Sequence, residues 1–182
     1  MRVIAGRYGG RRLKSPDGLG TRPTSDRVRE ALFAILGDLA GVRAIDLFAG
    51  TGALGIEALS RGAERVVFVE HDRDALAVTR ANLEALGVDS EHATVRHEDA
   101  LHALETAQDR KETYDLVLID PPYKLAREWG AKLSAVLPAL LEPGARLVAE
   151  SDRRTPLELE PELALATQRR YGHTEIRVYR HE

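Results

Sequence analysis

Hydrophobic residues along this chain fall into two alternating patterns, short continuous apolar runs and longer stretches with a helical period. The apolar runs predict buried β-strands, and the amphipathic stretches between them predict helices. Continuous apolar strands separated by helices are typical of a parallel sheet that is covered on both faces. The predicted strands of this kind are 44–47, 65–70, 93–97, 114–119 and 145–149.

The first predicted helix has a polar start, an apolar stripe and a glycine end. Thr24, Ser25 and Asp26 are consecutive N-cap candidates, and Gly37 follows the last apolar residue. The apolar side chains recur at intervals of three and four residues, so one side of the helix is expected to be buried. The residues off this stripe, expected on a solvated or ion-paired face, are Arg27, Arg29 and Glu30.

Both ends of the chain carry shorter strand patterns. Segments 2–5 and 12–14, separated by glycines, predict an N-terminal hairpin with exposed arginines. Segments 163–166 and 175–179 predict an antiparallel pair that turns at a glycine between them. The helix before the last parallel strand is expected to end at the Pro-Gly pair 143–144.

The composition is that of an ordinary globular protein. The 182 residues, 43% hydrophobic and 30% charged, suit one domain with a sizeable core. No apolar run approaches the ~18 residues of a membrane span, and residues 1–7 lack the apolar core of a signal peptide, so we expect a cytoplasmic protein. The absence of cysteine excludes disulfides, thiolate catalysis and cysteine-ligated metals.

The net charge of −3 conceals an asymmetry between the first 22 residues and the rest. Residues 1–22 carry six basic side chains and one acidic side chain, a local charge of +5 against −8 for the remainder. A basic segment on an acidic body suits a nucleic acid, because phosphate neutralisation drives much of the affinity for polyanions. A solvated basic terminus explains the charges equally well. The basic residues are Arg2, Arg7, Arg11, Arg12, Lys14 and Arg22.

A glycine-rich turn joins the first predicted parallel strand to the helix after it. Gly50, Gly52 and Gly55 match G-x-G-x-x-G, and Asp46 lies near the end of the preceding strand. Such glycines let a ligand approach the backbone closely, so the motif predicts a cofactor site. The same motif serves nicotinamide, flavin and S-adenosylmethionine sites, and some copies are only turns. The Asp46 carboxylate could receive an ammonium group or organise the loop, and a nicotinamide site does not require it.

Acidic residues also follow the second and third strands. Glu70, twenty residues after Gly50, is placed to accept both ribose hydroxyls of an adenosine cofactor, whether NAD or S-adenosylmethionine. Asp99 could accept the exocyclic amine of adenine, or it could cap the following helix. Three histidines in this region lack the spacing of a helical metal pair and predict no metal site; they are His92, His97 and His102.

The fourth strand leads into Asp120, Pro121, Pro122 and Tyr123. Ligands of open α/β sheets bind at the carboxyl ends of strands where the winding reverses, so this loop is expected to face the glycine turn. Two prolines leave a rigid loop, in which the Asp120 carboxylate and the Pro121 carbonyl can accept both hydrogens of an NH₂ group. Tyr123 could stack on the ring that carries this group. The loop predicts alkylation of an amino nitrogen on a nucleobase that has left its stack; a rigid turn is the alternative.

Together these motifs resemble the Rossmann-like, S-adenosylmethionine-dependent amino methyltransferases. More narrowly, segments 4–7, 10–13, 21–30 and 48–55 are similar to the bacterial 16S rRNA guanine-N2 methyltransferases of the RsmD type. The resemblance covers nearly the whole chain and is weakest after Glu150. It implies an α/β, Rossmann-like class I fold with a central, mainly parallel seven-stranded sheet, an antiparallel last strand and an N-terminal hairpin. The implied organisation is a single domain over 1–182, with a basic hairpin over 1–22 and a catalytic core over 24–182.

The resemblance also implies a role for each motif. S-adenosylmethionine is the implied cofactor, and 16S rRNA or the assembling 30S subunit is the implied partner of a monomer that needs no metal and no membrane. The implied cofactor-binding residues are Asp46, Phe48, Ala49, Gly50, Gly52, Glu70, Asp99 and Ala100. The implied catalytic residues are Asp120, Pro121, Pro122 and Tyr123, and the implied RNA contacts are Arg7, Arg11, Arg12, Lys14 and Arg22.

Other activities remain open from the sequence. A DNA adenine-N6 or cytosine-N4 methyltransferase would use the same acceptor loop, because that loop recognises an amine without specifying the base. A nicotinamide oxidoreductase is compatible with the glycine turn and Glu70 but leaves Asp46 and the Pro-Pro loop unexplained. An RNA-binding module with a vestigial cofactor pocket is a third reading. The wider amino methyltransferase class often has Asn where this chain has Asp120, so that residue either takes a proton or only orients the amine.

Overall fold

The computed structural model describes residues 1–15, 25–159 and 163–182, and for Tyr123 it describes only the backbone. In these residues five α-helices alternate with the first five strands, and two further strands follow, in the order that the sequence pattern predicts. The helices are α1 (Asp26–Leu36), α2 (Ala53–Ser60), α3 (Arg73–Leu86), α4 (Ala100–Asp109) and α5 (Ala126–Val136), with short 3₁₀ turns η1 (Tyr123–Leu125) and η2 (Leu137–Leu140). The strands are β1 (Arg43–Asp46), β2 (Arg65–Glu70), β3 (Ala93–His97), β4 (Tyr114–Ile119), β5 (Leu141–Asp152), β6 (Ala164–Tyr171) and β7 (Thr174–Arg180).

The strands form one seven-stranded sheet in the order β3-β2-β1-β4-β5-β7-β6. The first five strands are parallel, and β7 is antiparallel to both β5 and β6. This confirms the predicted mainly parallel sheet with an antiparallel last strand. The order reverses between β1 and β4, so the winding of the sheet changes direction there.

Alternate residues of the central strands bury two separate hydrophobic clusters, one on each face of the sheet. Ala44, Val66 and Leu116 belong to the cluster that includes side chains of α1, α2 and α3. Their neighbours Ile45 and Val67 belong to the opposite cluster, together with side chains of α4 and α5. Both faces of the strands are therefore covered, as their continuous apolar sequence predicts.

The end of α5 differs from the prediction. The helix ends at Val136 and passes through η2 into β5, so the Pro-Gly pair 143–144 lies inside a strand. Pro138 accounts for the earlier end, because its ring lacks the N–H that an α-helix would pair with the Ser134 carbonyl. The register of β5 against β4 shifts between Leu141 and Arg146, which accommodates the Pro-Gly pair as a bulge.

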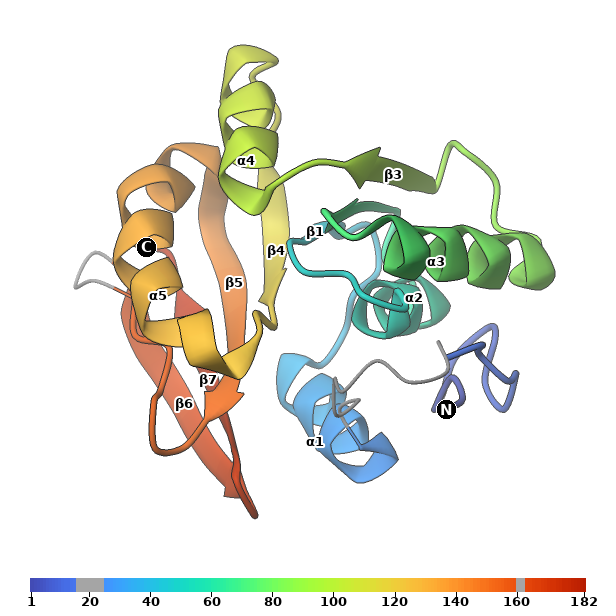
Figure 1. Ribbon diagram of the computed structural model, residues 1–182, viewed down its shortest axis with the longest axis horizontal. Helices are drawn as coiled ribbons and strands as arrows, with labels where there is room; N and C mark the ends of the chain where they lie inside the picture. The colour runs from blue at the N-terminus through green and yellow to red at the C-terminus, as the bar shows by residue number, and fades with distance from the viewer. Residues whose placement is uncertain (16–24, 160–162) are drawn as a thin grey trace.

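The N-terminal segment folds back on itself but does not form the two predicted strands. One antiparallel bridge, Arg2 with Arg12, joins its two halves. Val3 and Leu13 are buried in the hydrophobic cluster of α1, α2 and α3. We call residues 1–15 the N-terminal arm; in Figure 1 it lies beside α2 and α3, on the side of the molecule away from β6 and β7.

Arg29 in α1 is not on a solvated face. Its side chain is fully buried, where it donates to Asp26 Oδ1 (2.8 Å) and to the Arg2 carbonyl (2.7 Å). For Arg29 the expected ion pair is confirmed and the expected solvation is wrong, because the arm covers this part of α1; Arg27 and Glu30 are exposed, as expected. The N-cap prediction holds, since Ser25 Oγ accepts from the Val28 N–H.

Candidate active site

The carboxyl ends of the central parallel strands bring the predicted motifs to one edge of the sheet. Asp46 ends β1 and Glu70 ends β2, while Asp99 and Asp120 follow β3 and β4. The Leu47 N–H donates to the Leu118 carbonyl (3.0 Å), so the glycine turn begins next to the end of β4. The two halves of the predicted site therefore follow neighbouring strands at the switch point between β1 and β4.

The glycine turn is held in a form that larger residues would disrupt. Gly52, the N-cap of α2, has φ +79°, and a Cβ atom there would lie 3.0 Å from Thr79 Cγ2. A Cβ atom on Gly55 would lie 2.3 Å from the Phe68 ring, so Gly55 serves the close packing of α2 on β2.

Asp46 organises the glycine turn through a buried hydrogen bond to its backbone. The side chain is buried, and its Oδ2 accepts from the Gly55 N–H at 3.0 Å, which supplies the helix start with the acceptor that Gly52 lacks. Burial raises the pKa of Asp46 to about 7, and the neighbouring Glu70 carboxylate adds to the rise. Its Oδ1 atom is buried without a hydrogen-bond partner among the described residues. The expected loop-organising role is therefore confirmed, and one oxygen is left for another donor.

Glu70 already bonds to the backbone of the loop that it was predicted to serve. Its Oε2 accepts from the Gly50 N–H and its Oε1 from the Asp72 N–H, both at 2.9 Å. His71 Nδ1 lies 3.1 Å from Oε1. A carboxylate has about four acceptor positions, so these bonds leave capacity for hydroxyl donors.

Asp99 caps α4, as the structural alternative for this residue predicted. Its exposed side chain accepts from the Leu101 N–H at 2.9 Å. Ala100, the first residue of the helix, is buried. Their contact with adenine stays a prediction.

Phe48 and Ala49 hold the other side of the glycine turn. The Phe48 ring packs edge-on against Trp129 of α5, with centroids 5.0 Å apart. The Ala49 N–H donates to the Val69 carbonyl (3.0 Å), and its carbonyl accepts from Gly52 (2.7 Å). The turn is thereby attached to β2 and α5.

The Asp-Pro-Pro-Tyr segment leaves β4 and enters η1. Asp120 is half-buried, Pro121 is buried and Pro122 is exposed. The Pro122 carbonyl accepts from the Leu125 N–H at 2.9 Å, so it belongs to the turn. The Tyr123 side chain lies outside the described part of the structure, and its stacking role stays a prediction.

Residues of α3 that the sequence did not single out connect the glycine turn to the N-terminal arm. The buried Asn82 amide donates to the Thr51 carbonyl (2.9 Å) and the Lys14 carbonyl (3.1 Å), and its oxygen accepts from the Lys14 N–H (2.7 Å). Thr79 Oγ1 donates to the Gly50 carbonyl (2.7 Å). Both polar side chains lie within the apolar stripe of α3. A polar residue at a position that the helical period predicts to be buried is the one sequence signal that could have indicated their role.

We expect the Asn82→Ala substitution to loosen the arm and the cofactor turn together. It leaves three backbone groups without their partner, at a cost of about 2–4 kcal/mol in the free energy of unfolding, or roughly 4–16 °C in Tm. Limited trypsin digestion should cleave the arm faster at Arg11, Arg12 and Lys14. The matched control is Glu84→Ala, an exposed change on the same helix; equal digestion rates for the two variants would contradict the connection.

The described arm residues that are predicted to contact RNA are exposed, as that role requires. They are Arg7, Arg11, Arg12 and Lys14; Arg22 lies outside the described residues. Arg11 donates to the Ala85 carbonyl (2.9 Å), and the Arg7 guanidinium lies over the Tyr8 ring. Their contact with RNA stays a prediction.

The described residues lack a metal-binding cluster and a membrane-spanning helix. No group of three or more histidine, aspartate or glutamate side chains there is arranged to hold a metal ion. None of the described helices combines the length and the apolar character needed to cross a bilayer.

Comparison with known proteins agrees with the fold and the motifs. The family model described as "Conserved hypothetical protein 95" matches residues 1–180. The Bacillus subtilis protein named "Putative rRNA methyltransferase YlbH" is 41% identical over 187 residues, covering 99% of this chain and 98% of that protein. The Haemophilus influenzae "Ribosomal RNA small subunit methyltransferase D" is 33% identical over 180 residues, covering 98% of this chain and 93% of that protein.

Solved structures lead to the same family. The structure titled "Putative methyltransferase yhhF from Escherichia coli" superimposes with a TM-score of 0.83 at 34% identity, covering 100% of this chain and 98% of that chain. The family match spans nearly all of this sequence, and the Bacillus subtilis and Haemophilus influenzae relatives match it over almost their full length. The chain belongs to the family described as Conserved hypothetical protein 95.

Proposed function

We propose that this protein transfers a methyl group from S-adenosylmethionine to the exocyclic N2 of a guanine in small-subunit rRNA. Family membership and relatives named as rRNA methyltransferases support methylation of rRNA. The guanine-N2 specificity rests on the resemblance of the motifs and on the chemistry of the Asp-Pro-Pro-Tyr loop. The observation that carries the proposal is that this loop and the glycine turn leave the neighbouring strands β4 and β1 at the same edge of the sheet.

The residues around the glycine turn fit S-adenosylmethionine, the methyl donor that this proposal requires. The unpartnered Oδ1 of Asp46 suits the ammonium group of its methionine part, because a buried carboxylate oxygen gains most from a charged donor. Glu70 has acceptor positions left for the ribose hydroxyls. The cofactor supplies an electrophilic methyl group; the protein positions it through the turn that Asp46 and Glu70 hold.

The Asp120 loop would orient the receiving nitrogen. The lone pair of an exocyclic amine is delocalised into its ring, so acceptors for both hydrogens favour its localisation toward the methyl group. The nitrogen forms a bond to the methyl carbon as the carbon–sulfur bond breaks. One proton leaves the nitrogen, and the products are methylated RNA and S-adenosylhomocysteine. Holding the two reactants in line supplies much of the rate enhancement in such transfers.

The test is to identify the methylated nucleoside. The protein is incubated with methyl-labelled S-adenosylmethionine and, separately, unmodified 30S particles, naked 16S rRNA and duplex DNA, and each product is digested to nucleosides. N2-methylguanosine from either RNA sample is expected, and the preferred RNA sample identifies the stage of assembly. N6-methyladenine or N4-methylcytosine from DNA would overturn the substrate assignment.

Reversing two charges of the arm should weaken RNA binding. We expect Arg11→Glu with Arg12→Glu to weaken binding of a 16S rRNA fragment about 10- to 100-fold at moderate salt. The slope of log K against log salt should become shallower by about two, because two phosphate contacts are lost. The control is Arg169→Glu on β6, exposed and far from the arm. Wild-type affinity in the double variant would show that the arm does not contact RNA.

A further inference from the structure

The tip of the N-terminal arm borders a cavity of about 380 Å³. This volume is within the range of small-ligand sites, ~300–1,000 Å³. The cavity lies between the tip of the arm and the C-terminal ends of α2 and α3, where Ser60 and Val88 line it. Because α2 starts at the carboxyl edge of the sheet and leads back to the start of β2, the cavity is at the edge opposite the candidate active site.

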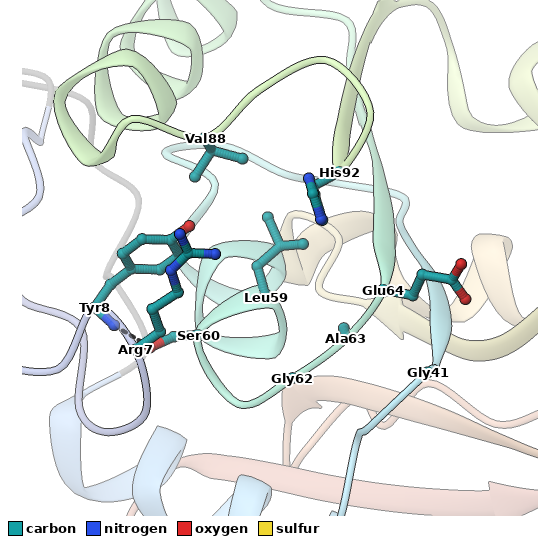
Figure 2. A pocket seen from close by; sticks show the side chains of 10 residues that line it. All are labelled: Arg7, Tyr8, Gly41, Leu59, Ser60, Gly62, Ala63, Glu64, Val88 and His92. Carbon is teal, nitrogen blue, oxygen red and sulfur yellow. Dashed lines mark hydrogen bonds between the residues drawn. The ribbon is translucent and has the colours of Figure 1, made fainter.

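Hydrogen bonds to the end of α2 fix the tip of the arm. The Arg7 N–H donates to the Ser60 carbonyl (2.7 Å), and the Tyr8 N–H donates to Ser60 Oγ (2.9 Å), the contact dashed in Figure 2. Gly6 has φ +81°, and a Cβ atom there would lie 1.8 Å from the Ser60 carbonyl oxygen. Only glycine permits this approach, so the wall that Arg7 and Tyr8 form is held in place.

The side chains that line the cavity suit a flat aromatic ligand. The Arg7 guanidinium lies 5.4 Å from the centre of the Tyr8 ring, and Figure 2 shows the two groups together on one side, with Leu59 and His92 beyond them. His92 is held by Asp89, 2.6 Å from its Nδ1 atom. Glu64 points away from the Tyr8 side in Figure 2. Arginine planes and aromatic rings are the groups on which proteins stack unpaired RNA bases.

The arm follows α2 along its length and so connects the two edges of the sheet. Thr51 Oγ1, before the helix, donates to Met1 Sδ. Glu57, within it, accepts from the Ile4 N–H (2.7 Å) and the Ala5 N–H (3.1 Å). The tip of the arm then contacts Ser60, the last residue of α2. An eight-residue helix is about 12 Å long, a distance of roughly three to four stacked nucleotides at ~3.4 Å each.

We propose that the cavity between Tyr8 and His92 binds an unpaired nucleobase of the substrate RNA, a few nucleotides away from the methylated one. The proposal rests on the proposed rRNA substrate. The base enters beside the Arg7–Tyr8 pair and covers Leu59, while the exposed arginines of the arm lie along the connecting phosphates. A base held there adds affinity for the RNA equally before and during methyl transfer, because the cavity lies away from the reacting groups.

The first experiment measures how a 16S rRNA fragment binds to variants of Tyr8. We expect Tyr8→Ala to weaken binding about tenfold, as loss of one base–aromatic stack does, while Tyr8→Phe binds as wild type. The salt slope should not change, because no phosphate contact is removed. The methylation kcat at saturating RNA should also be unchanged, with the RNA KM raised. Leu165→Ala, which removes an exposed apolar side chain on β6, is the matched control.

The second experiment locates the contact directly. RNA containing 4-thiouridine is crosslinked to the wild-type protein by light, and the peptides are identified; crosslinks to the segments around Tyr8 or His92 are expected. Unchanged affinity of Tyr8→Ala for RNA, or crosslinks only to other segments, would overturn the proposal. So would a loss of affinity confined to 30S particles, which indicates a ribosomal-protein contact.

Binding and crosslinking do not depend on which nucleoside is methylated. Failure of the cavity proposal therefore leaves the identification of N2-methylguanosine intact. Conversely, a methylated product other than N2-methylguanosine would overturn the proposed function, whatever the behaviour of Tyr8.

Discussion

The Asp46→Asn variant should be more stable than the wild-type protein at pH 8 and should bind S-adenosylmethionine more weakly. The pKa of this buried carboxyl is raised to about 7, against 3.8 for an ordinary aspartate. One pKa unit corresponds to 1.36 kcal/mol, and the new amide N–H₂ lacks a partner, so we expect a net gain of about 2 kcal/mol in the free energy of unfolding. The Asn oxygen still accepts from the Gly55 N–H.

The pH dependence determines the direction of the stability difference between Asp46→Asn and the wild type. Between pH 4 and pH 7 the folded protein keeps the Asp46 proton while the unfolded chain releases it, so the wild type loses stability as pH rises through this window. The advantage of Asp46→Asn should therefore grow from pH 4 to pH 7 and stay constant above pH 7. Thermal unfolding of the cofactor-free proteins across this range measures it, with Asp38→Asn, an exposed change, as the control.

The same substitution should weaken the binding of S-adenosylmethionine. Loss of a charge-assisted hydrogen bond to the ammonium group, worth about 1.5–3 kcal/mol, should raise the Kd of S-adenosylmethionine about 10- to 100-fold. Calorimetric titration of both proteins with S-adenosylmethionine at pH 8 measures the Kd. Parallel pH profiles of stability for the two proteins would mean that Asp46 is ionised throughout, and wild-type affinity would remove it from the cofactor site.

The Asp120→Ala variant should lose methyl transfer while it still binds S-adenosylmethionine. Asp120 follows β4 and is not among the residues assigned to the cofactor, so the Kd should be unchanged. Removing a group that orients the amine or takes its proton should lower kcat at least ~100-fold. Single-turnover transfer to 16S rRNA measures the rate, and cofactor titration provides the internal control for folding. Full activity of Asp120→Ala would remove the loop from the mechanism.

The Asp120→Asn variant separates the two roles of the carboxylate. Asparagine keeps an acceptor oxygen but has no negative charge and cannot take a proton at neutral pH. If Asp120 only orients the amine, Asp120→Asn should keep most of the activity that Asp120→Ala loses. If Asp120 takes the proton, the two variants should be equally slow, and the log-linear fall of the wild-type rate at low pH should be absent from both.

The order of strands and helices follows from local patterns in the sequence. Apolar runs such as 65–70 and 114–119 are long enough to mark buried strands, and N-caps such as Asp72 and Asp99 act within a few residues of themselves. The prediction that the helix before β5 ends at 143–144 was wrong, because whether a Pro-Gly pair ends a helix or forms a bulge depends on the neighbouring strand.

The carboxyl-edge position of Asp46, Glu70 and Asp120 was also predictable, because parallel strands place their ends together. What these carboxylates contact was not. The bond from Glu70 to Gly50 joins residues 20 positions apart, and the bonds from Asn82 to Lys14 join residues 68 positions apart. No local pattern encodes such pairs.

By itself, the sequence determined the parallel sheet, the glycine turn, the loop after β4 and the basic character of the first residues, because each depends on composition or short-range spacing. Only the tertiary structure decided that the arm is packed against α2 and α3, that Arg29 is buried and that Asn82 connects the arm to the turn. These features arise when distant segments exclude water from the same polar groups, and burial then requires each group to find a partner.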